Sequence, residues 1–367
     1  MIYELMNTLG QINVFRYITF RTACGMMTAL IFCYLLYPPY IAWLRRTRME
    51  QIIRTDGPQE HVENKVGTPT MGGVVMLGGI TLSTLLWARL DEPRVWMALI
   101  VTLGCGLIGL YDDWKKVMER AADGLAGRWK LFWQVLIGGG TFGGAYATGL
   151  MDARLHFPFY KHAVLDFSML WDGAPTWLGW VYVGMAIFVM VGCSNAVNLT
   201  DGLDGLAIGS TITSASTFAV LAYLAGHTAF AEYLQVPYIT GAGELSIFAM
   251  SIVGAGLGFL WYNSYPAQIF MGDVGSLALG GALASMAIIT KHEILLALVG
   301  GVFVMETVSV MLQVVYFKAT KGKRLFKMAP IHHHYEKSGW SEPKIIVRFW
   351  IISGLLALVA LTTLKLR

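Results

Sequence analysis

The sequence predicts an all-α polytopic membrane protein with about ten transmembrane helices, and three observations support this prediction. First, 56% of the 367 residues are hydrophobic and only 14% are charged, whereas a soluble domain has roughly 25% charged residues. Second, apolar stretches long enough to cross a bilayer recur along the whole chain. Third, the basic residues are concentrated in alternate loops, as in multi-pass membrane proteins. We therefore expect residues 1–367 to form a single integral membrane domain.

A helix needs about 20 mostly apolar residues to span the hydrocarbon core. Ten segments satisfy this requirement, at residues 18–44, 70–89, 95–112, 131–150, 177–196, 205–225, 244–262, 272–290, 294–316 and 345–365. Two longer loops, 151–176 and 226–243, are rich in Pro, Gly and aromatic residues and hold no cluster of reactive side chains. We expect these two loops to form a structural cap with a short hairpin.

The distribution of basic residues predicts the orientation of the chain in the membrane. The loops 45–69, 113–130 and 317–344 carry 17 of the 27 Lys and Arg residues, whereas the opposite loops carry 5. Loops rich in Lys and Arg remain in the cytoplasm. An even number of spans then places both termini on the outer side of the membrane. All the motifs described below lie in or next to the basic loops, so we expect the active site at the cytoplasmic face.

Three aspartates at the ends of predicted spans are candidate catalytic residues. Asp112 and Asp113 close the third span, and neighbouring residues on a helix point about 100° apart, so we expect them to have different roles. Ionisable groups at membrane depth are costly and usually functional, although a solvated helix end is the alternative. Asp273 opens the eighth span, where helix N-terminal amides favour a negative charge. It is either an N-cap or a ligand of Mg²⁺, which prefers one or two carboxylates together with substrate phosphates.

The segment 195–205 (NAVNLTDGLDG) has a polar residue at every third position. At helical spacing, Asn195, Asn198 and Asp201 form one polar stripe. Gly202 and Gly205 allow the backbone to leave helical geometry and approach a ligand. This segment is a candidate binding site, with a polar loop as the alternative.

Two basic loops and one histidine-rich loop complete the set. Lys65 precedes the glycine-containing loop 67–73, which resembles a phosphate cradle but lacks the spacing GxxxxGK[ST]. Lys130 supplies a cation before the fourth span. The three histidines at 332–334 suggest zinc, but adjacent histidines project in different directions, and no Cys or HExxH pattern accompanies them. We favour recognition of a diphosphate by this loop. Together these residues predict phosphoryl transfer, in which a protein mainly positions groups and neutralises charge, to an acceptor in the membrane.

These motifs resemble those of the prenyl-phosphate sugar-1-phosphate transferases, and the resemblance covers almost the whole chain. It rests on residues 67–73 (GTPTMGG), 112–113 (DD), 195–205, 270–276 (FMGDVGS) and 328–336 (MAPIHHHYE). The histidine-rich loop is similar to that of the muramoyl-pentapeptide branch of the family. The resemblance implies transfer of phospho-MurNAc-pentapeptide from UDP-MurNAc-pentapeptide to undecaprenyl phosphate, giving lipid I and UMP, the first membrane step of peptidoglycan synthesis.

The resemblance also implies the setting of this activity. Family members are Mg²⁺-dependent, commonly homodimeric, and inhibited by uridine nucleoside antibiotics. They are located in the bacterial inner membrane, so both termini of this chain would be periplasmic. No nucleic acid is expected as a partner.

Residue roles follow from the matching motifs as further implications. Asp273 would bind Mg²⁺, while Asp112 and Asp113 would orient or deprotonate the lipid phosphate or assist the metal. The remaining implied substrate-binding residues are Asn198, Asp201 and Asn263 in the nucleotide and metal pocket, Gly202 and Leu203 on the uracil side, Lys65, Lys130, His332, His333 and His334 on phosphates or the sugar-peptide, and Thr70 and Phe270 within the matching motifs.

Several alternatives remain open at this point. A sister transferase would use UDP-N-acetylglucosamine with the same lipid, and only the loop 328–336 argues against it. An ion-coupled transporter also has intramembrane carboxylates, and a structural scaffold would not depend on them. For the transferase, either the lipid phosphate attacks directly or an aspartate first forms a phospho-enzyme. We favour direct attack because a phosphate monoester, with a second pKa of about 6, is already mostly dianionic near neutral pH.

Overall fold

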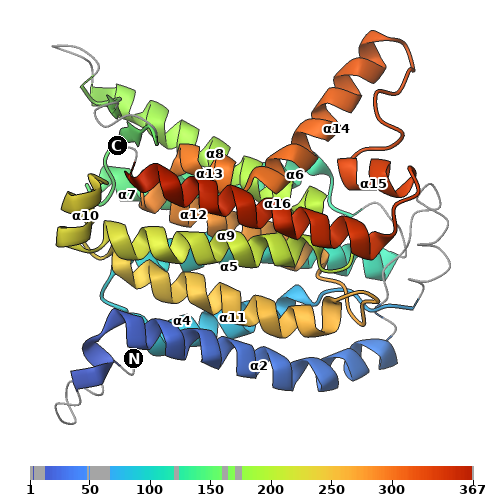
Figure 1. Cartoon of the computed structure of the whole chain (residues 1–367), viewed down its shortest axis with the longest axis horizontal. Coiled ribbons are helices and arrows are strands. Elements are labelled where there is room, and N and C mark those ends of the chain that lie inside the picture. The colour runs from blue at the N-terminus through green and yellow to red at the C-terminus, as the bar shows by residue number, and fades with distance from the viewer. Residues whose placement is uncertain are drawn as a thin grey trace.

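The computed structural model describes residues 3, 13–47, 49, 67–119, 124–158, 164–169 and 176–365. Lys65 lies outside these residues. Within them the protein is a bundle of long helices that run roughly side by side, with one small antiparallel hairpin at one end (Figure 1). The prediction of an all-α polytopic membrane protein is therefore confirmed.

The elements follow one another in the order that the apolar segments predict. They are η1 (Asn13–Arg16), α2 (Ile18–Arg46), α4 (Gly73–Trp87), α5 (Pro93–Glu119), α6 (Gly127–Gly138), the π-helical η2 (Gly139–Gly143), α7 (Gly144–Ala147), β1 (Arg154–His156), β2 (Val164–Asp166), η3 (Thr176–Leu178), α8 (Gly179–Thr200), α9 (Leu206–Ala225), α10 (Thr228–Leu234), η4 (Ala242–Glu244), α11 (Leu245–Asn263), α12 (Gly272–Ile289), α13 (Glu293–Val299), α14 (Gly301–Ala319), α15 (Ile331–Glu336), α16 (Glu342–Thr362) and η5 (Thr363–Lys365).

In the described part of the chain, eight helices are long and apolar enough to cross a membrane. The shorter α4 occupies the second predicted span. Helix α6, η2 and α7 follow one another without interruption over the fourth predicted span. The number of ten membrane crossings stays a prediction, as does the membrane side on which the termini lie.

The expected span over residues 294–316 is not one continuous helix, although α14 within it is long and apolar enough to cross a membrane. The chain forms α13 and α14 there, and Gly300 separates the two helices. Glycine is the weakest helix former apart from proline, and a side chain at the adjacent Gly301 would clash with Leu356. As a result α14 turns away and projects from the body of the bundle (Figure 1).

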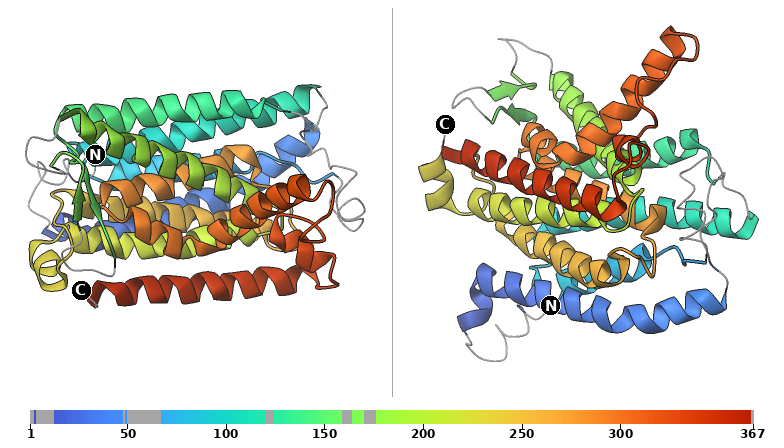
Figure 2. Two further views of the ribbon diagram at one scale, coloured as in Figure 1. Left: turned by 90° about the horizontal axis from the view of Figure 1, so that it is seen from above. Right: turned by 45° about the vertical axis from the view of Figure 1, so that its right-hand side comes forward.

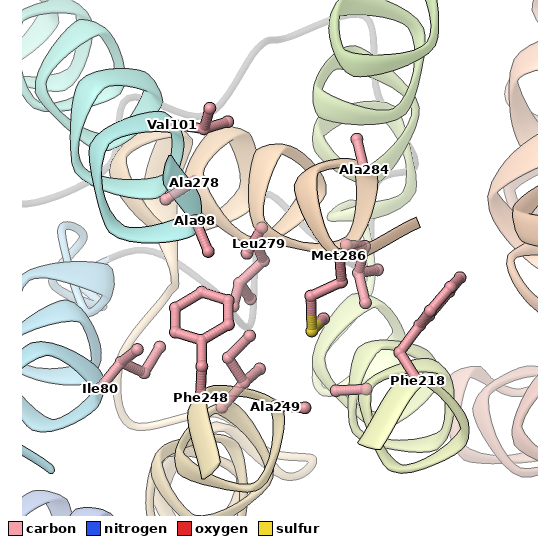
Figure 3. Close-up of a cluster of buried hydrophobic side chains, with 14 of the residues drawn as sticks. Ile80, Ala98, Val101, Phe218, Phe248, Ala249, Ala278, Leu279, Ala284 and Met286 are labelled. Carbon is pink, nitrogen blue, oxygen red and sulfur yellow. The ribbon is translucent and has the colours of Figure 1, made fainter. Parts of the chain in front are cut away.

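Helix α12 is the centre of the bundle, and its small residues explain why. In its 18-residue apolar stretch, 89% of the residues are buried inside the protein, compared with 22% for the corresponding stretches of the peripheral helices α2 and α14. Side chains of α4, α5, α9 and α11 surround it, among them Phe218 and Phe248 (Figure 3). A Cβ on Gly280 would overlap the backbone of Ser194 in α8. Small residues allow helix backbones to approach this closely.

The two ends of the bundle differ. The β-hairpin, in which Arg154 pairs with Asp166, lies together with α10 at one end, which we call the hairpin end (Figure 2). Helix α2 begins and α16 ends at this same end. The hairpin expected within residues 151–176 is thus present. The opposite end carries Asp112, Asp113 and Asp273, and we call it the acidic end.

Candidate active site at the acidic end

The acidic end is built where α5 and α12 touch. A Cβ on Gly109 of α5 would overlap the backbone carbonyl of Asp273, so the two helices meet at this point because glycine is present. Asp112 and Asp113 lie within α5, about two turns before its end, and they are 0% and 4% exposed. The alternative of a solvated helix end is therefore wrong. Asp273 lies in the first turn of α12 and makes no capping hydrogen bond there, so it is not an N-cap.

The three carboxylates form one cluster. Asp112, Asp113 and Asp273 each offer an oxygen, and these oxygens lie within 4.8 Å of one another. Among the described residues they are the one group of three or more His, Cys, Asp or Glu side chains with this property. The arrangement joins two motifs that are separated by 160 residues in the sequence.

Two lysines bridge the carboxylates. Lys116 lies one turn after Asp112, and its Nζ is 2.5 Å from Asp112 Oδ2 and 3.2 Å from Asp273 Oδ2. Lys130, from the start of α6, places its Nζ 3.0 Å from Asp112 Oδ2 and 2.7 Å from Asp273 Oδ2. Removing charges from water is costly unless they are paired, and this network provides the pairing.

Amide groups fix the remaining carboxylate oxygens. Asn198, on the last turn of α8, donates to Asp273 Oδ1 at 2.9 Å and to Ser276 Oγ at 2.8 Å. The Leu125 amide donates to Asp112 Oδ1 at 2.5 Å. The Val274 amide donates to Asp113 Oδ2 at 3.1 Å. The amide partner of each aspartate is therefore different, although Lys116 and Lys130 are shared. Different roles for Asp112 and Asp113 stay a prediction.

The glycine loop 67–73 packs against the start of α12 instead of presenting free amides. Gly72 N donates to the Phe270 carbonyl at 2.8 Å, and Gly73 N donates to the Met271 carbonyl at 2.9 Å. Thr70 is buried beside Gly272. The loop thus brings Thr70 and Phe270 next to the acidic cluster, but the amides of Gly72 and Gly73 are already engaged and do not form a phosphate cradle.

The predicted polar stripe of segment 195–205 is interrupted, because α8 ends at Thr200. Asp201 and Gly202 follow directly and are partly buried. The Asn263 side chain accepts a hydrogen bond from Gly205 N and donates to the Ile269 carbonyl. Asn263 therefore holds two loops together through both ends of its amide.

Leu203 belongs to a small apolar cluster with Ile345 and Phe349 of α16. Asp204 accepts a hydrogen bond from Ala267 N at 2.9 Å. These contacts connect the end of α8 to the loop before α12 and to α16. They give the backbone around Gly202 a fixed position.

The three histidines point in different directions from α15. His332 is buried, and its Nδ1 is 3.0 Å from Glu306 Oε2 of α14. His333 Nδ1 is 2.5 Å from Glu336 Oε2, and His334 Nδ1 accepts a hydrogen bond from Lys327 N. No two of them converge with a third ligand within the described residues, so the geometry disfavours the zinc alternative.

Gly202 connects this histidine helix to α8. A Cβ at Gly202 would overlap the Nε2 end of His332. The absence of a side chain at this position therefore allows α15 to approach α8.

Sequence reasoning missed three residues of this site. Lys116 was not singled out, although its spacing of four residues from Asp112 is the spacing of a helical ion pair. Ser276 lies three residues after Asp273 on the same helix, which was a usable signal. Glu306 lies in an apolar segment, and only the general rarity of charges in such segments could have drawn attention to it.

The acidic cluster fits a hard divalent cation. All three side chains offer carboxylate oxygens, which are the ligands that Mg²⁺ prefers. The ammonium groups of Lys116 and Lys130 already lie between carboxylates of α5 and α12, so the site is built to hold positive charge between these helices. Asp273, with a side chain 16% exposed, is the most accessible of the three carboxylates.

Comparison with known proteins identifies the family. Residues 95–291, more than half of the chain, match the model of glycosyl transferase family 4. A phospho-N-acetylmuramoyl-pentapeptide-transferase of Syntrophus aciditrophicus is 54% identical over 367 residues, covering 100% of this chain and 99% of the relative. Proteins of the same name from Desulfotalea psychrophila and Pelobacter propionicus are 52% and 53% identical, with the same coverage. The chain therefore belongs to the phospho-N-acetylmuramoyl-pentapeptide-transferase family.

Proposed function

We propose that this protein transfers phospho-MurNAc-pentapeptide from UDP-MurNAc-pentapeptide to undecaprenyl phosphate, producing lipid I and UMP. The observation that carries the proposal is the cluster of three carboxylates within 4.8 Å, bridged by two lysines, at one end of a membrane helix bundle. At such a position, a lipid phosphate from the adjacent leaflet would meet a soluble nucleotide.

The charge of the cluster suits a metal-dependent reaction of phosphates. Three carboxylates and two ammonium groups leave a net negative charge. We propose that Asp273 holds Mg²⁺, together with oxygens of Asp112 or Asp113. Bound Mg²⁺ would neutralise the phosphates and polarise the bond that breaks.

In the proposed reaction, an oxygen of the lipid phosphate attacks the β-phosphorus of the donor. The bond from this phosphorus to the bridging oxygen breaks, and UMP departs with the electron pair. Lys130 and Lys116 are in position to neutralise charge on the phosphates as they enter. Asp112, held by the Leu125 amide, would orient the acceptor phosphate, which needs little deprotonation near neutral pH.

We assign the uridine of the donor to the backbone around Gly202 and Leu203, and its diphosphate and sugar-peptide to α15. The support for this assignment is the contact between Gly202 and His332. The partly buried His333 lies next to that contact. Asp201 and Thr70 would border the same pocket, and Lys65 would contribute a further cation from outside the described residues. Uridine nucleoside antibiotics would compete for this pocket.

The acidic end would face the cytoplasm of a bacterial inner membrane, with both termini periplasmic. The support is the concentration of basic residues in loops 45–69, 113–130 and 317–344. We also propose a homodimer, as the family resemblance implies.

Release of UMP by the purified protein tests this function. With undecaprenyl phosphate and Mg²⁺, UDP-MurNAc-pentapeptide should give UMP, and UDP-N-acetylglucosamine should not. Turnover of UDP-N-acetylglucosamine alone would favour the sister transferase, and no UMP from either donor would refute a transferase. A phosphorylated Asp273 or Asp112, trapped without lipid acceptor, would replace direct attack with a phospho-enzyme mechanism.

A further inference from the structure

A second site lies at the hairpin end of the bundle. It is a cavity of about 370 Å³ that is lined by the start of α5, residues 150–156, residues 237–240 and the end of α12. Cavities that bind small ligands have volumes of roughly 300–1,000 Å³. The space is therefore sufficient for a compact polar group, such as the head group of a lipid.

The helices α5 and α12 place this cavity far from the acidic cluster. Arg94 lines the cavity, and Asp112 follows it by 18 residues on the same helix, which corresponds to about 27 Å along the helix axis. Ile289 also lines the cavity and follows Asp273 by 16 residues on α12, or about 24 Å. The cavity and the acidic cluster therefore lie at opposite ends of these helices, separated by a distance close to the thickness of about 30 Å of a bilayer's hydrocarbon core.

Among the residues that line the cavity, three carry a positive charge and one is a carboxylate. Arg94, Arg154 and Lys291 line it, together with one carboxylate, Asp152. The cations come from three separate segments and meet only in the folded protein. The loops 151–176 and 226–243, which we expected to form a structural cap, supply part of this lining, and a ligand site here goes beyond that expectation.

Lys291 holds Asp152 in place at the wall of the cavity. It is 5% exposed, and its Nζ lies 2.7 Å from the Asp152 carbonyl, 2.7 Å from Asp152 Oδ1 and 2.9 Å from the Tyr182 hydroxyl. Burial lowers the pKa of Lys291, and the neighbouring Asp152 carboxylate opposes that change. The three N–H donors of the ammonium group are used by these contacts, so Lys291 contributes charge and holds residue 152 in place.

The two arginines keep donors available. Each guanidinium has five N–H donors. Arg94 donates from Nη1 to Glu92 at 2.8 Å and from Nη2 to the Leu150 carbonyl at 3.3 Å. Arg154 donates from Nε to Asp166 at 3.0 Å. Neither Glu92 nor Asp166 lines the cavity, so these carboxylates orient the guanidinium groups without filling the space before them.

We propose that this cavity binds a phosphate group, carried either by the head group of a lipid or by inorganic phosphate. Planar guanidinium groups recognise phosphate through paired N–H donors, and Arg94 and Arg154 keep such donors although each is paired with a carboxylate behind it. A lipid head group and free phosphate present the same oxygens to Arg94 and Arg154. The site is separate from the transferase reaction, so its ligand is a second ligand of the protein.

Binding measurements on the full-length protein in detergent test the proposal. One arm titrates phosphatidylglycerol, against a diacylglycerol with the same acyl chains, and counts bound lipid by native mass spectrometry. The other arm titrates inorganic phosphate by calorimetry. The main variant is Arg154→Gln, whose side chain is 52% exposed and therefore tolerates substitution. A double variant adds Arg94→Gln. The matched control is Arg89→Gln, an exposed arginine between α4 and α5 that pairs with Asp91 and does not line the cavity.

The expected result is about tenfold weaker binding of a phosphate probe to Arg154→Gln, with a larger loss in the double variant, because charge-assisted hydrogen bonds are removed. The Arg89→Gln protein should bind like the unaltered protein, and all variants should release UMP at the original rate. If the variants bind phosphatidylglycerol more weakly but bind inorganic phosphate as before, the ligand is a lipid. If they bind inorganic phosphate more weakly, the ligand is free phosphate. Equal binding by all variants, or no binding of either probe to the unaltered protein, would overturn the proposal.

Discussion

The two ends of α5 and α12 pair their charges differently. At the acidic end, Lys116 and Lys130 are shared among three carboxylates that come from two helices. At the hairpin end, Arg94 and Arg154 each form an ion pair with a carboxylate nearby in the sequence. A shared network in which carboxylates are in excess favours an incoming cation, whereas separate ion pairs that leave guanidinium N–H donors unused favour an incoming anion.

The comparison also distinguishes residues that we expect to act in catalysis from residues that we expect to affect ligand binding or stability. At the acidic end, the charges of Asp112 and Asp113 are buried, which is costly without a compensating function. At the hairpin end, Arg154 is half exposed and Arg94 is partly buried, while Lys291 is buried. We therefore expect substitutions at the acidic end to change catalysis, and substitutions at the hairpin end to change ligand binding or stability.

The largest effect is expected for Asp273→Asn. This change removes the most accessible charge of the cluster while it preserves the shape of the side chain. Loss of one preorganised electrostatic contact typically costs 10²–10³-fold in rate, so we expect a decrease of about 10³-fold in UMP release. Helical content and melting temperature should remain near those of the unaltered protein. Near-normal turnover would remove the basis for the proposed site.

A smaller loss, about 10²-fold, is expected for Lys130→Met, because its ammonium group bridges Asp112 and Asp273. The comparison is made with Arg154→Gln, which removes one positive charge at the other end. Steady-state kinetics should show a lower rate of UMP release for Lys130→Met and an unchanged rate for Arg154→Gln. Equal losses in both variants would show that overall charge matters and the location of the charge does not.

Gly202→Ala should lower kcat/KM for the nucleotide donor by about tenfold, since misplacement by 1 Å can cost up to 10²-fold. The added methyl group would displace His332. Gly184→Ala in α8 is the matched control, because a Cβ there meets no atom within 4 Å. If Gly202→Ala and Gly184→Ala have the same kinetics, α15 does not contribute to donor recognition.

The smallest effect on catalysis is expected for Lys291→Met. Its contacts with Asp152 and Tyr182 would be lost, and we expect a melting temperature lower by a few degrees. UMP release per folded molecule should not change, as measured at a temperature well below the transition. A selective loss of turnover would mean that the two ends are coupled.

Much of the fold was predictable because lipid imposes a simple rule on the sequence. Apolar segments of sufficient length marked helices such as α5 and α12. The break at Gly300 was not predicted, because a glycine in an apolar segment is equally compatible with close helix packing. The extension of α5 through Glu119 was also missed, since charged residues after Asp113 resembled the end of a span.

The candidate site was predictable where a motif carried the relevant residues. Asp112, Asp113 and Asp273 come together as expected, and Asn198 contacts Asp273 directly. The engagement of Asn263 with backbone groups depends on loop geometry that no local pattern encodes. The cavity at the hairpin end was not predictable, because Arg94, Arg154 and Lys291 are separated by long stretches of sequence and belong to no motif.

The most direct test of the central claim is to locate a divalent ion in a structure of the protein with Mn²⁺ and UDP-MurNAc-pentapeptide, using anomalous scattering. We predict an ion bound directly by Asp273, beside Asp112 and Asp113 and in contact with the diphosphate of the donor. An active preparation whose ion lies away from these three carboxylates, or whose nucleotide lies at the hairpin end, would contradict the account.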